Sequence, residues 1–169
     1  MNKIKNQKIE QFLDDLSSSS ATPGGGATAA LTAAMAASLV EMVAGLTLGK
    51  TGYEKNQKEI RTIKTKAAKA GKILVVLADE DVTAYNSVVA GYGAKDKKRI
   101  KTALMRATDV PSDVIKLANQ VEKMAARMVV IGNKNAVSDA KSALFLSQSA
   151  AKSALENVKI NKRALAGIK

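Results

Sequence analysis

The sequence predicts an all-α protein, an alanine-rich antiparallel bundle of about six helices.

 Apolar residues recur at the three- and four-residue spacing of helices, and no alternating strand pattern appears. Aromatic residues make up only 3% of the chain and Trp is absent, so Ala, Leu, Val, Ile and Met must form the core. Such small side chains allow close helix packing. We expect one domain over residues 1–169, because this length suits a single hydrophobic core.

The first two predicted helices differ in pattern. The helix near residues 3–16 is amphipathic, with apolar side chains at helical spacing: Ile9, Phe12, Leu13 and Leu16. The serine run 17–20 ends it. Residues 27–48 are apolar all round, with Glu41 as the only charge, which is the pattern of a helix surrounded by protein. We do not expect a membrane span here, because Ala, Thr, Ser and Gly dominate and lack the large apolar side chains that insertion requires.

The remaining helices follow from the same spacing. A long helix is expected from near Glu54 to Tyr92, ended by Gly91 and Gly93. A helix over residues 97–107 is expected to stop before Pro111, which disfavours helical geometry in the preceding residue and can open the next helix.

The helix that Pro111 opens should close at Gly132-Asn133, a pair suited to a left-handed cap. The last helix is expected from about Asn135 to Ile160.

The composition excludes several kinds of metal site and catalytic mechanism. The chain contains neither Cys nor His, which excludes disulfides, thiolate and imidazole metal sites, Ser-His-Asp catalysis and histidine bases. Carboxylates, lysines, tyrosines and backbone groups remain. The net charge of +12 favours an anionic partner or simple solubility, with basic residues crowded between Lys50 and Lys72. Nucleic acid is not the expected partner, because few aromatic side chains are present to stack on bases.

The turn Thr22-Pro23-Gly24-Gly25-Gly26 is the first candidate site. Thr22 can cap the following helix and Pro23 suits its first position. The presence of three glycines needs another explanation, because each glycine inside a helix destabilises it by about 1 kcal/mol relative to Ala. Their bare N–H groups can receive an anion or a planar polar ligand, and we favour this over a purely structural turn. The turn is not a P-loop, since Lys does not follow the glycines.

Lys50 belongs to the second candidate, Leu46-Thr47-Leu48-Gly49-Lys50 with Tyr53 and Glu54 beyond it. The structural interpretation is a helix end, with Gly49 as the cap and Lys50 complementing the dipole. The functional interpretation makes Lys50 a cation for a ligand carboxylate or a proton donor.

The third candidate is Asp79-Glu80-Asp81, with Tyr85 one turn after Asp81. Three adjacent acids point in different helical directions, so at most one or two can face inward. An inward Asp81 would have a raised pKa and could act as a general base, whereas a solvated acidic turn is the alternative.

The fourth candidate is Gly132-Asn133 followed by Ser138-Asp139. Asn133 or Asn135 can cap the last helix, and Asp139 lies about one turn inside it, where the positive end of the dipole favours a carboxylate. Both a structural role and a site role remain open.

Taken together, these segments resemble the cyclodeaminase/cyclohydrolase family of folate enzymes. The motifs occur in family order across most of the chain: Pro23-Gly24-Gly25-Gly26, Leu46 to Lys50 with Tyr53-Glu54, Asp81 with Ala84-Tyr85, Pro111, Gly132-Asn133, Ser138-Asp139-Ala140, and Asn157-Val158 with Asn161. In two respects the chain departs from the family: Ala27 stands where many relatives have Ser, and the chain stops soon after Asn161.

The resemblance implies an all-helical homodimer that acts on tetrahydrofolate one-carbon derivatives. A cytoplasmic location is expected because the polar N-terminal residues show no secretory signal. No metal or prosthetic group is required, because the methenyl carbon is already electrophilic and tetrahydrofolate is itself the substrate. The hypothesis assigns Asp81 and Asp139 as base or cation-stabilising groups, and Lys50 and Tyr85 as proton donors or ligand anchors. The glycine amides and Asn133 would bind the ligand, with Pro23 completing the turn, and the basic residues 55–72 would attract a polyglutamate tail.

Three functions stay open at this point. We favour hydrolysis of 5,10-methenyltetrahydrofolate to 10-formyltetrahydrofolate, because no formiminotransferase domain is fused to these residues. The alternative is a formiminotetrahydrofolate cyclodeaminase that releases ammonia. A non-catalytic basic helical protein that binds an acidic partner is the alternative from another class.

Overall fold

The computed structural model describes residues 3–168, and the regular structure within them is helical. It comprises five α-helices, α1 (Ile9–Ser17), α2 (Gly25–Gly45), α3 (Gln57–Gly93), α4 (Lys97–Ile131) and α5 (Val137–Ala166). Three single turns of 3-10 helix precede α1, α3 and α5: Ile4–Asn6, Glu54–Asn56 and Lys134–Ala136. The all-α prediction is confirmed, but the described residues form five α-helices where about six were expected.

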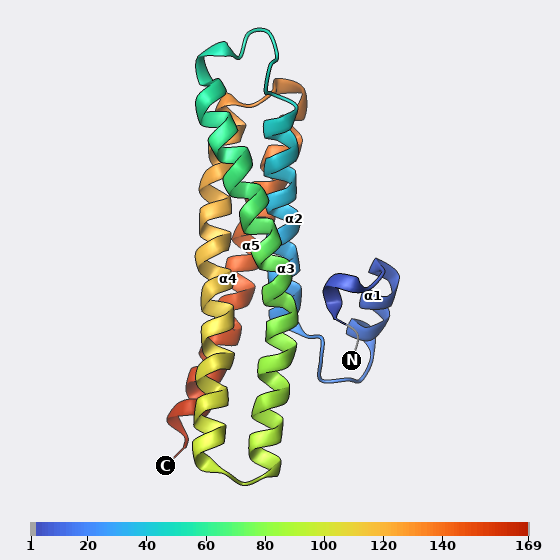
Figure 1. The fold of residues 1–169 in the computed structure, drawn as a ribbon, viewed down its shortest axis with the longest axis vertical. Coiled ribbons are helices and arrows are strands. Elements are labelled where there is room, and N and C mark those ends of the chain that lie inside the picture. The colour runs from blue at the N-terminus through green and yellow to red at the C-terminus, as the bar shows by residue number, and fades with distance from the viewer. Residues whose placement is uncertain (1–2, 169) are drawn as a thin grey trace.

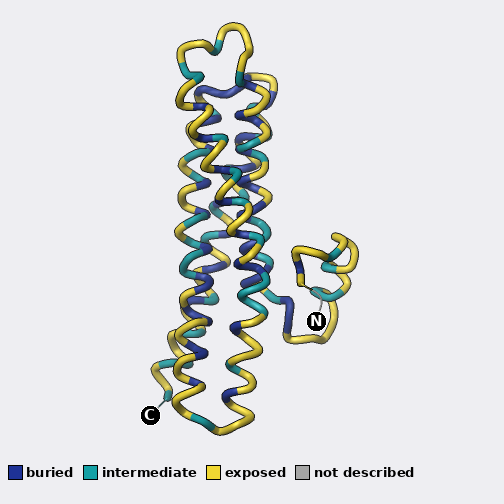
Figure 2. The backbone as a smooth tube through the Cα atoms, in the orientation of Figure 1, coloured by how far each residue is buried: buried dark blue, intermediate teal, exposed yellow. Residues whose placement is uncertain are grey.

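Helices α2 to α5 form an up-down bundle in which each helix is antiparallel to the next (Figure 1). Their order around the bundle is α2, α3, α4 and α5, so α2 lies diagonally across from α4. Helix α1 stands beside the bundle and not inside it (Figure 1). Buried residues line the interior along the length of the bundle, whereas α1 contains none (Figure 2).

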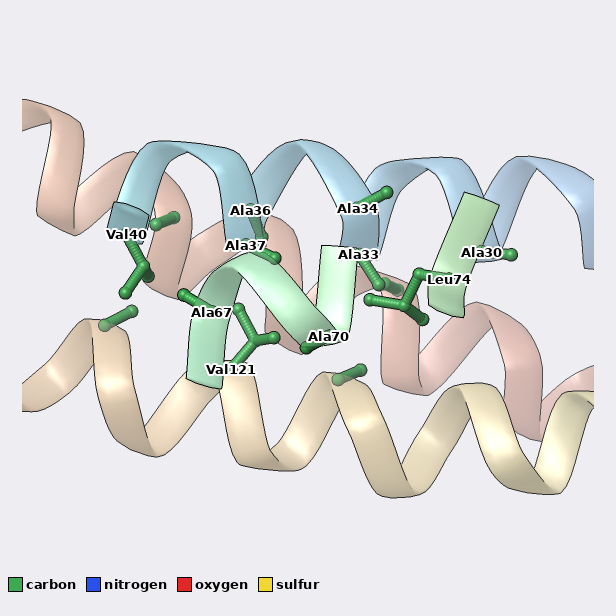
Figure 3. Packing of buried hydrophobic residues seen from close by; sticks show 14 of the residues in the cluster. Ala30, Ala33, Ala34, Ala36, Ala37, Val40, Ala67, Ala70, Leu74 and Val121 are labelled. Carbon is green, nitrogen blue, oxygen red and sulfur yellow. The ribbon is translucent and has the colours of Figure 1, made fainter. Parts of the chain in front are cut away.

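The core is built mainly of alanine, as the composition predicts. Helix α2 contributes Ala33, Ala36 and Ala37 to the interior of the bundle, and each of the three is fully buried (Figure 3). A Cβ added at Gly71 of α3 would lie 3.6 Å from the Cβ of Ala37, so the two helices are nearly in backbone contact. Helix α2 is long and apolar enough to cross a membrane by length and composition, but 56% of its most apolar window is buried in the bundle. Its environment is therefore that of a core helix.

Pro111 does not end a helix, contrary to the prediction, but lies inside α4. A proline within a helix leaves the carbonyl four residues earlier without its backbone donor. Here that carbonyl belongs to Ala107, and it accepts a hydrogen bond of 2.6 Å from Nδ2 of Asn161 on α5. The side chain of Asn161 replaces the missing donor, so the two predicted helices are one.

The predicted helix ends also need correction. Gly24 is the N-cap residue of α2, so Thr22 and Pro23 precede the helix and neither caps nor opens it. Gly132 has φ −80° and Asn133 φ −57°, so the expected left-handed cap is absent. Gly132 is required for another reason, because an added Cβ would lie 2.4 Å from the carbonyl oxygen of Met128.

Candidate active site

The three glycines bring the start of α2 against α3 and α5. Gly26 is buried, and a Cβ at this position would lie 2.1 Å from Oδ1 of Asp81. Gly25 is exposed, and a Cβ there would meet Nδ2 of Asn157 at 3.6 Å, an ordinary contact. The absence of a side chain at Gly26 is therefore what admits the Asp81 carboxylate to the first turn of α2.

Each acid of the sequence Asp79-Glu80-Asp81 contacts a different neighbour, as the helical geometry predicts. Oδ1 of Asp79 accepts a hydrogen bond of 2.6 Å from the backbone N–H of Ile4. Glu80 forms an ion pair with Arg106 of α4. Asp81 is the acid that faces the glycine turn.

Asp81 is partly buried and is not in an ion pair within residues 3–168. Burial raises the pKa of its carboxyl above the ordinary value, because removal from water penalises the charged form. A hydrogen bond from the backbone N–H of Ala27 lowers that pKa and so opposes part of the effect. A carboxylate in this state is suited to accept a proton or to stabilise a neighbouring cation.

Two other predicted residues lie at the same end of α2. Pro23 is buried and lines a pocket of about 200 Å³ between α3 and the N-terminal segment, together with Ile4 and Asp79. Tyr85 lies one turn beyond Asp81 on α3, with 42% of its surface exposed. The side chain of Tyr85 is therefore partly open to solvent.

Lys50 and Asn133 lie at the other end of α2. Nζ of Lys50 donates a hydrogen bond of 3.3 Å to Oδ1 of Asn133. Asn133 is buried, its backbone N–H donates to Oγ1 of Thr47 at 2.9 Å, and its Nδ2 donates to the carbonyl of Leu46 at 3.1 Å. Asn133 thus fastens the segment before α5 to the end of α2 and holds Lys50 at the tip of the bundle.

Further contacts stabilise this tip. Oδ1 of Asn133 also accepts from the N–H of Asn135, which makes Asn133 the cap of the 3-10 turn before α5. The prediction that Asn133 or Asn135 caps the last helix is wrong, because the N-cap residue of α5 is Ala136, which has no side-chain cap. The hydroxyl of Tyr53 accepts a hydrogen bond of 3.0 Å from the N–H of Lys134. Asp139 occupies the first turn of α5, where the dipole favours it, as predicted.

Within one chain the predicted residues therefore form two groups. Asp81, Tyr85 and Pro23 gather with the glycines at the start of α2, whereas Lys50, Asn133 and Asp139 lie beyond its end. Helix α2 has 21 residues, so about 30 Å separates its two ends. The chain does not bring the two groups together.

Asn157 was not among the predicted site residues, although it contacts the glycine turn. Its Nδ2 donates to the carbonyl of Ser153 at 3.1 Å and lies next to the position where a Gly25 side chain would be. The available signal was its spacing from Asn161. Residues four apart lie on one side of a helix, so both asparagines belong to one face of α5. Asn157 lies next to Gly25 of α2, and Asn161 bonds Ala107 of α4.

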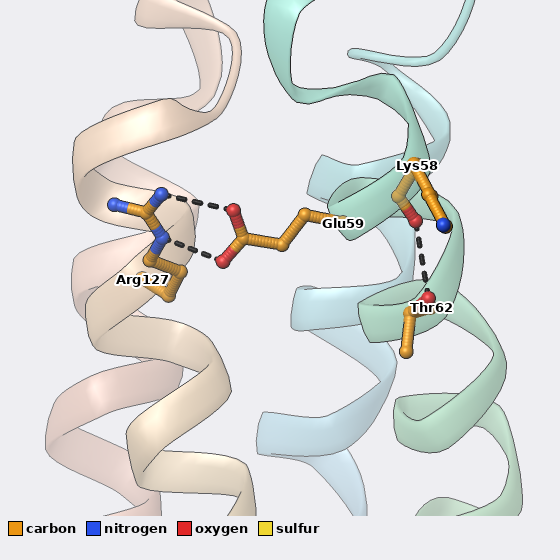
Figure 4. Close-up of polar contacts among 4 residues, drawn as sticks. All are labelled: Lys58, Glu59, Thr62 and Arg127. Atoms are coloured by element: carbon orange, nitrogen blue, oxygen red, sulfur yellow. Dashed lines mark hydrogen bonds and ion pairs between the residues drawn. The ribbon is translucent and has the colours of Figure 1, made fainter.

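A basic groove lies between α3 and α4, away from both groups. It encloses about 480 Å³ over an apolar floor that includes Ile73 and Leu117. Lys66, Lys69 and Lys123 stand at its edges. Closer to the Lys50 tip, Arg127 of α4 and Glu59 of α3 pair through bonds of 2.7 and 2.9 Å (Figure 4).

Comparisons with known proteins show which family the chain belongs to. The profile of the family described as Formiminotransferase-cyclodeaminase matches residues 8–167. The chain is 36% identical over 169 aligned residues to the methenyltetrahydrofolate cyclohydrolase of Methylorubrum extorquens, covering 95% of this chain and 81% of that protein. It is 29% identical over 140 residues to the formimidoyltransferase-cyclodeaminase of Dictyostelium discoideum, of which it covers 26%.

Among solved structures, the formiminotetrahydrofolate cyclodeaminase of Thermotoga maritima matches with a TM-score of 0.92 and 31% identity. The match covers 97% of this chain and 82% of that one. The chain belongs to the formiminotransferase-cyclodeaminase family.

Proposed function

We propose that the chain is a folate one-carbon enzyme that hydrolyses 5,10-methenyltetrahydrofolate to 10-formyltetrahydrofolate. The observation that carries this proposal is the 36% identity, over 95% of the chain, to a relative named methenyltetrahydrofolate cyclohydrolase. The partly buried carboxylate of Asp81 on the glycine turn supplies a group suited to that reaction.

The reaction needs a positioned water and a base. Water adds to the carbon of the cationic methenyl bridge, the base takes one proton from that water, and the bond from this carbon to N5 then breaks. The formyl group stays on N10, and N5 receives a proton. A carboxylate near the bridge would both stabilise the cation and accept the proton, which is the role we assign to Asp81.

The other residues would bind and orient the substrate. The bare turn from Pro23 to Gly26 would let the planar ring approach the backbone, and the exposed Tyr85 would contact it from α3. Lys50 would supply the proton for N5 or bind a carboxylate. Asn133 would hold Lys50 in place, because its side chain already bonds Lys50 and Leu46. Asp139 is the second candidate carboxylate, at the Lys50 end.

Formiminotetrahydrofolate cyclodeamination is the second candidate reaction. It is favoured by the TM-score of 0.92 to the Thermotoga maritima cyclodeaminase. In that reaction N5 carries the formimino group, N10 attacks its carbon, and ammonia leaves after protonation. A carboxylate and a proton donor serve both reactions, so the substrate distinguishes them.

We also propose where the protein acts and in what form. The protein would act in the cytoplasm as a homodimer, as one domain over residues 1–169, with no prosthetic group. The groove edged by Lys66, Lys69 and Lys123 would attract the polyglutamate tail of the substrate.

The test is to offer the purified protein each folate separately and to follow the methenyl chromophore. We expect loss of the chromophore from methenyltetrahydrofolate and no gain from formiminotetrahydrofolate. A gain from the formimino compound with release of ammonia would favour the cyclodeaminase. No change with either substrate would contradict both, and would leave a non-catalytic protein that binds an acidic partner.

A further inference from the structure

The basic groove between α3 and α4 leaves apolar side chains open to solvent. Ile73 of α3 lines its floor and is 39% exposed. Leu117 and Met124 line the floor from α4, and both are only partly buried. The volume of about 480 Å³ falls within the range of sites that bind ligands. The floor is therefore suited to an apolar group from another molecule, which would remove this surface from water.

The rim of the groove carries cations on both sides. Lys66 and Lys69 belong to α3, whereas Lys123 belongs to α4. None of these three lysines is in an ion pair within residues 3–168. Like charges on opposite sides of a groove repel each other, and an apolar floor beneath them screens this repulsion less than water does. An anion bound between the lysines would relieve the repulsion.

Above and below the groove, acids of α3 pair with bases of α4. Glu59 pairs with Arg127 at one end (Figure 4), and Glu80 pairs with Arg106 at the other. Between these two ion pairs, α3 lines the groove with lysines and not with acids. The acids of α4 that flank the groove residues in sequence have other partners: Asp113 pairs with Lys116, and Glu122 accepts a hydrogen bond from Gln148. Carboxylates for the rim lysines would therefore have to come from another molecule.

The spacing of the groove residues favours a helix as the occupant. Lys66, Ala70 and Ile73 of α3 are separated by four and three residues, and Leu117 lies seven residues before Met124 on α4. These are the spacings of a helix face that packs against another helix. Each face is about 10 Å long, which is about two turns of an α-helix. A third helix along the groove would bury its apolar residues on the floor and place flanking acids beside the lysines.

We propose that the basic groove is a docking site for another protein, which presents an acidic amphipathic helix. The apolar side of that helix covers the floor, and its carboxylates pair with Lys66, Lys69 and Lys123. This inference goes beyond the proposed function and does not depend on it, because the groove lies away from the glycine turn and from Lys50. A polyglutamate tail would use the lysines alone, since it has no apolar side chain to cover the floor.

Peptide binding to the whole chain tests the proposal. The probe is a synthetic helical peptide of about three heptads, with Leu at the a and d positions and Glu at the flanking e and g positions. Calorimetry should show binding that weakens as salt is added. Three compounds serve as comparisons, each expected to bind weaker by about tenfold or more: pentaglutamate, decanoate and a scrambled peptide of equal composition. No binding of the helical peptide, or equal binding of any comparison compound, would overturn the proposal.

Two variants locate the bound peptide. Ile73→Glu places a carboxylate on the floor, and the double variant Lys66→Gln, Lys69→Gln removes two of the three rim cations. Each variant should weaken peptide binding by about tenfold or more, because the first repels the Glu residues of the peptide and the second removes their partners. Val130→Glu and Lys72→Gln are the matched controls. They change charge at exposed positions of α4 and α3 that do not line the groove, and should bind like the wild type.

Circular dichroism and sedimentation complete the test. Each variant should keep the helical signal of the wild type, so that a lost affinity reports the groove and not unfolding. If Ile73→Glu unfolds, the double lysine variant decides. Equal losses of affinity in the groove variants and the controls would contradict the location. A smaller sedimenting mass for Ile73→Glu than for the wild type would show that a second copy of the chain fills the groove, and would also overturn the proposal.

Discussion

The two ends of α2 are constructed in opposite ways. At the glycine end, side chains are absent, and the carboxylate of Asp81 fills the space at Gly26. Burial raises the pKa of this carboxyl. At the Lys50 end, polar groups bond to one another, with Asn133 joined to Thr47, Leu46 and Lys50. The first arrangement leaves a partly buried carboxylate beside a turn without side chains. The second fixes the position of a cation. The comparison teaches that missing side chains open one end of α2, whereas hydrogen bonds between polar groups fasten the other.

Gly26→Ala should give the largest effect and test the glycine end directly. The new Cβ would overlap Oδ1 of Asp81 and force that side chain away, so we expect turnover to fall by about 100-fold or more. The measurement is loss of the methenyl chromophore. Gly25→Ala is the matched control, because its Cβ meets Asn157 only at 3.6 Å and should leave Asp81 in place. Equal losses in both variants would contradict the special role of Gly26.

Thr47→Val tests the Lys50 end, where stability and not reactivity should change. The substitution leaves the buried N–H of Asn133 without its acceptor, so we expect a loss of about 1–3 kcal/mol in the free energy of unfolding. Denaturant titration measures it. Thr62→Val is the control, since Thr62 is exposed and its hydroxyl bonds only the carbonyl of Lys58 one turn earlier (Figure 4). A neutral Thr47→Val would show that the tip does not depend on this bond.

Asp81→Asn should raise the stability of the protein, whereas Thr47→Val lowers it. The gain is expected only at pH values where the Asp81 carboxyl is ionised. Because the folded state raises the pKa of Asp81, it binds the proton more tightly than the unfolded state. Stability contributed by this group is therefore present in acid and lost as pH rises through the two pKa values. We expect Asp81→Asn to raise the melting temperature at neutral pH and to have little effect in strong acid. A gain that is equal at all pH values would contradict the burial effect.

Arg127→Met should have the smallest effect. The ion pair of Arg127 with Glu59 is nearly half exposed and therefore screened by water and salt. We expect a slight fall in melting temperature that disappears in molar salt. A large loss that salt does not reduce would mean that this pair, and not the buried bonds of Asn133, holds the Lys50 end.

Much of the fold could be predicted because helical periodicity is local. The spacing of apolar residues located each long helix, and adjacency within a helix correctly predicted that Asp79, Glu80 and Asp81 point in different directions. The exception was Pro111, where local rules predict a break. The compensating bond comes from Asn161 on another helix, and no local rule can anticipate a donor that distant in sequence.

The candidate site was less predictable, because it depends on which residues meet in space. The sequence identified Asp81 and the glycines separately, but their contact follows from how α3 crosses the start of α2. Lys50 and Asn133 were correctly singled out as polar residues near helix ends, and their bond to each other could not be read from positions more than 80 residues apart. Their distance of about 30 Å from the glycines follows from the length of α2, which the apolar run of the sequence indicates.

The role of Asp81 as the base is the central claim, and one rate comparison tests it most directly. The loss of the methenyl chromophore is measured for the wild-type chain, for Asp81→Asn and for Asp14→Asn, an exposed carboxylate on α1, with folding of each variant checked by circular dichroism. We predict that Asp81→Asn lowers kcat/KM by about 10²–10⁴-fold and that Asp14→Asn leaves it unchanged. A folded Asp81→Asn protein with the wild-type rate would contradict the account.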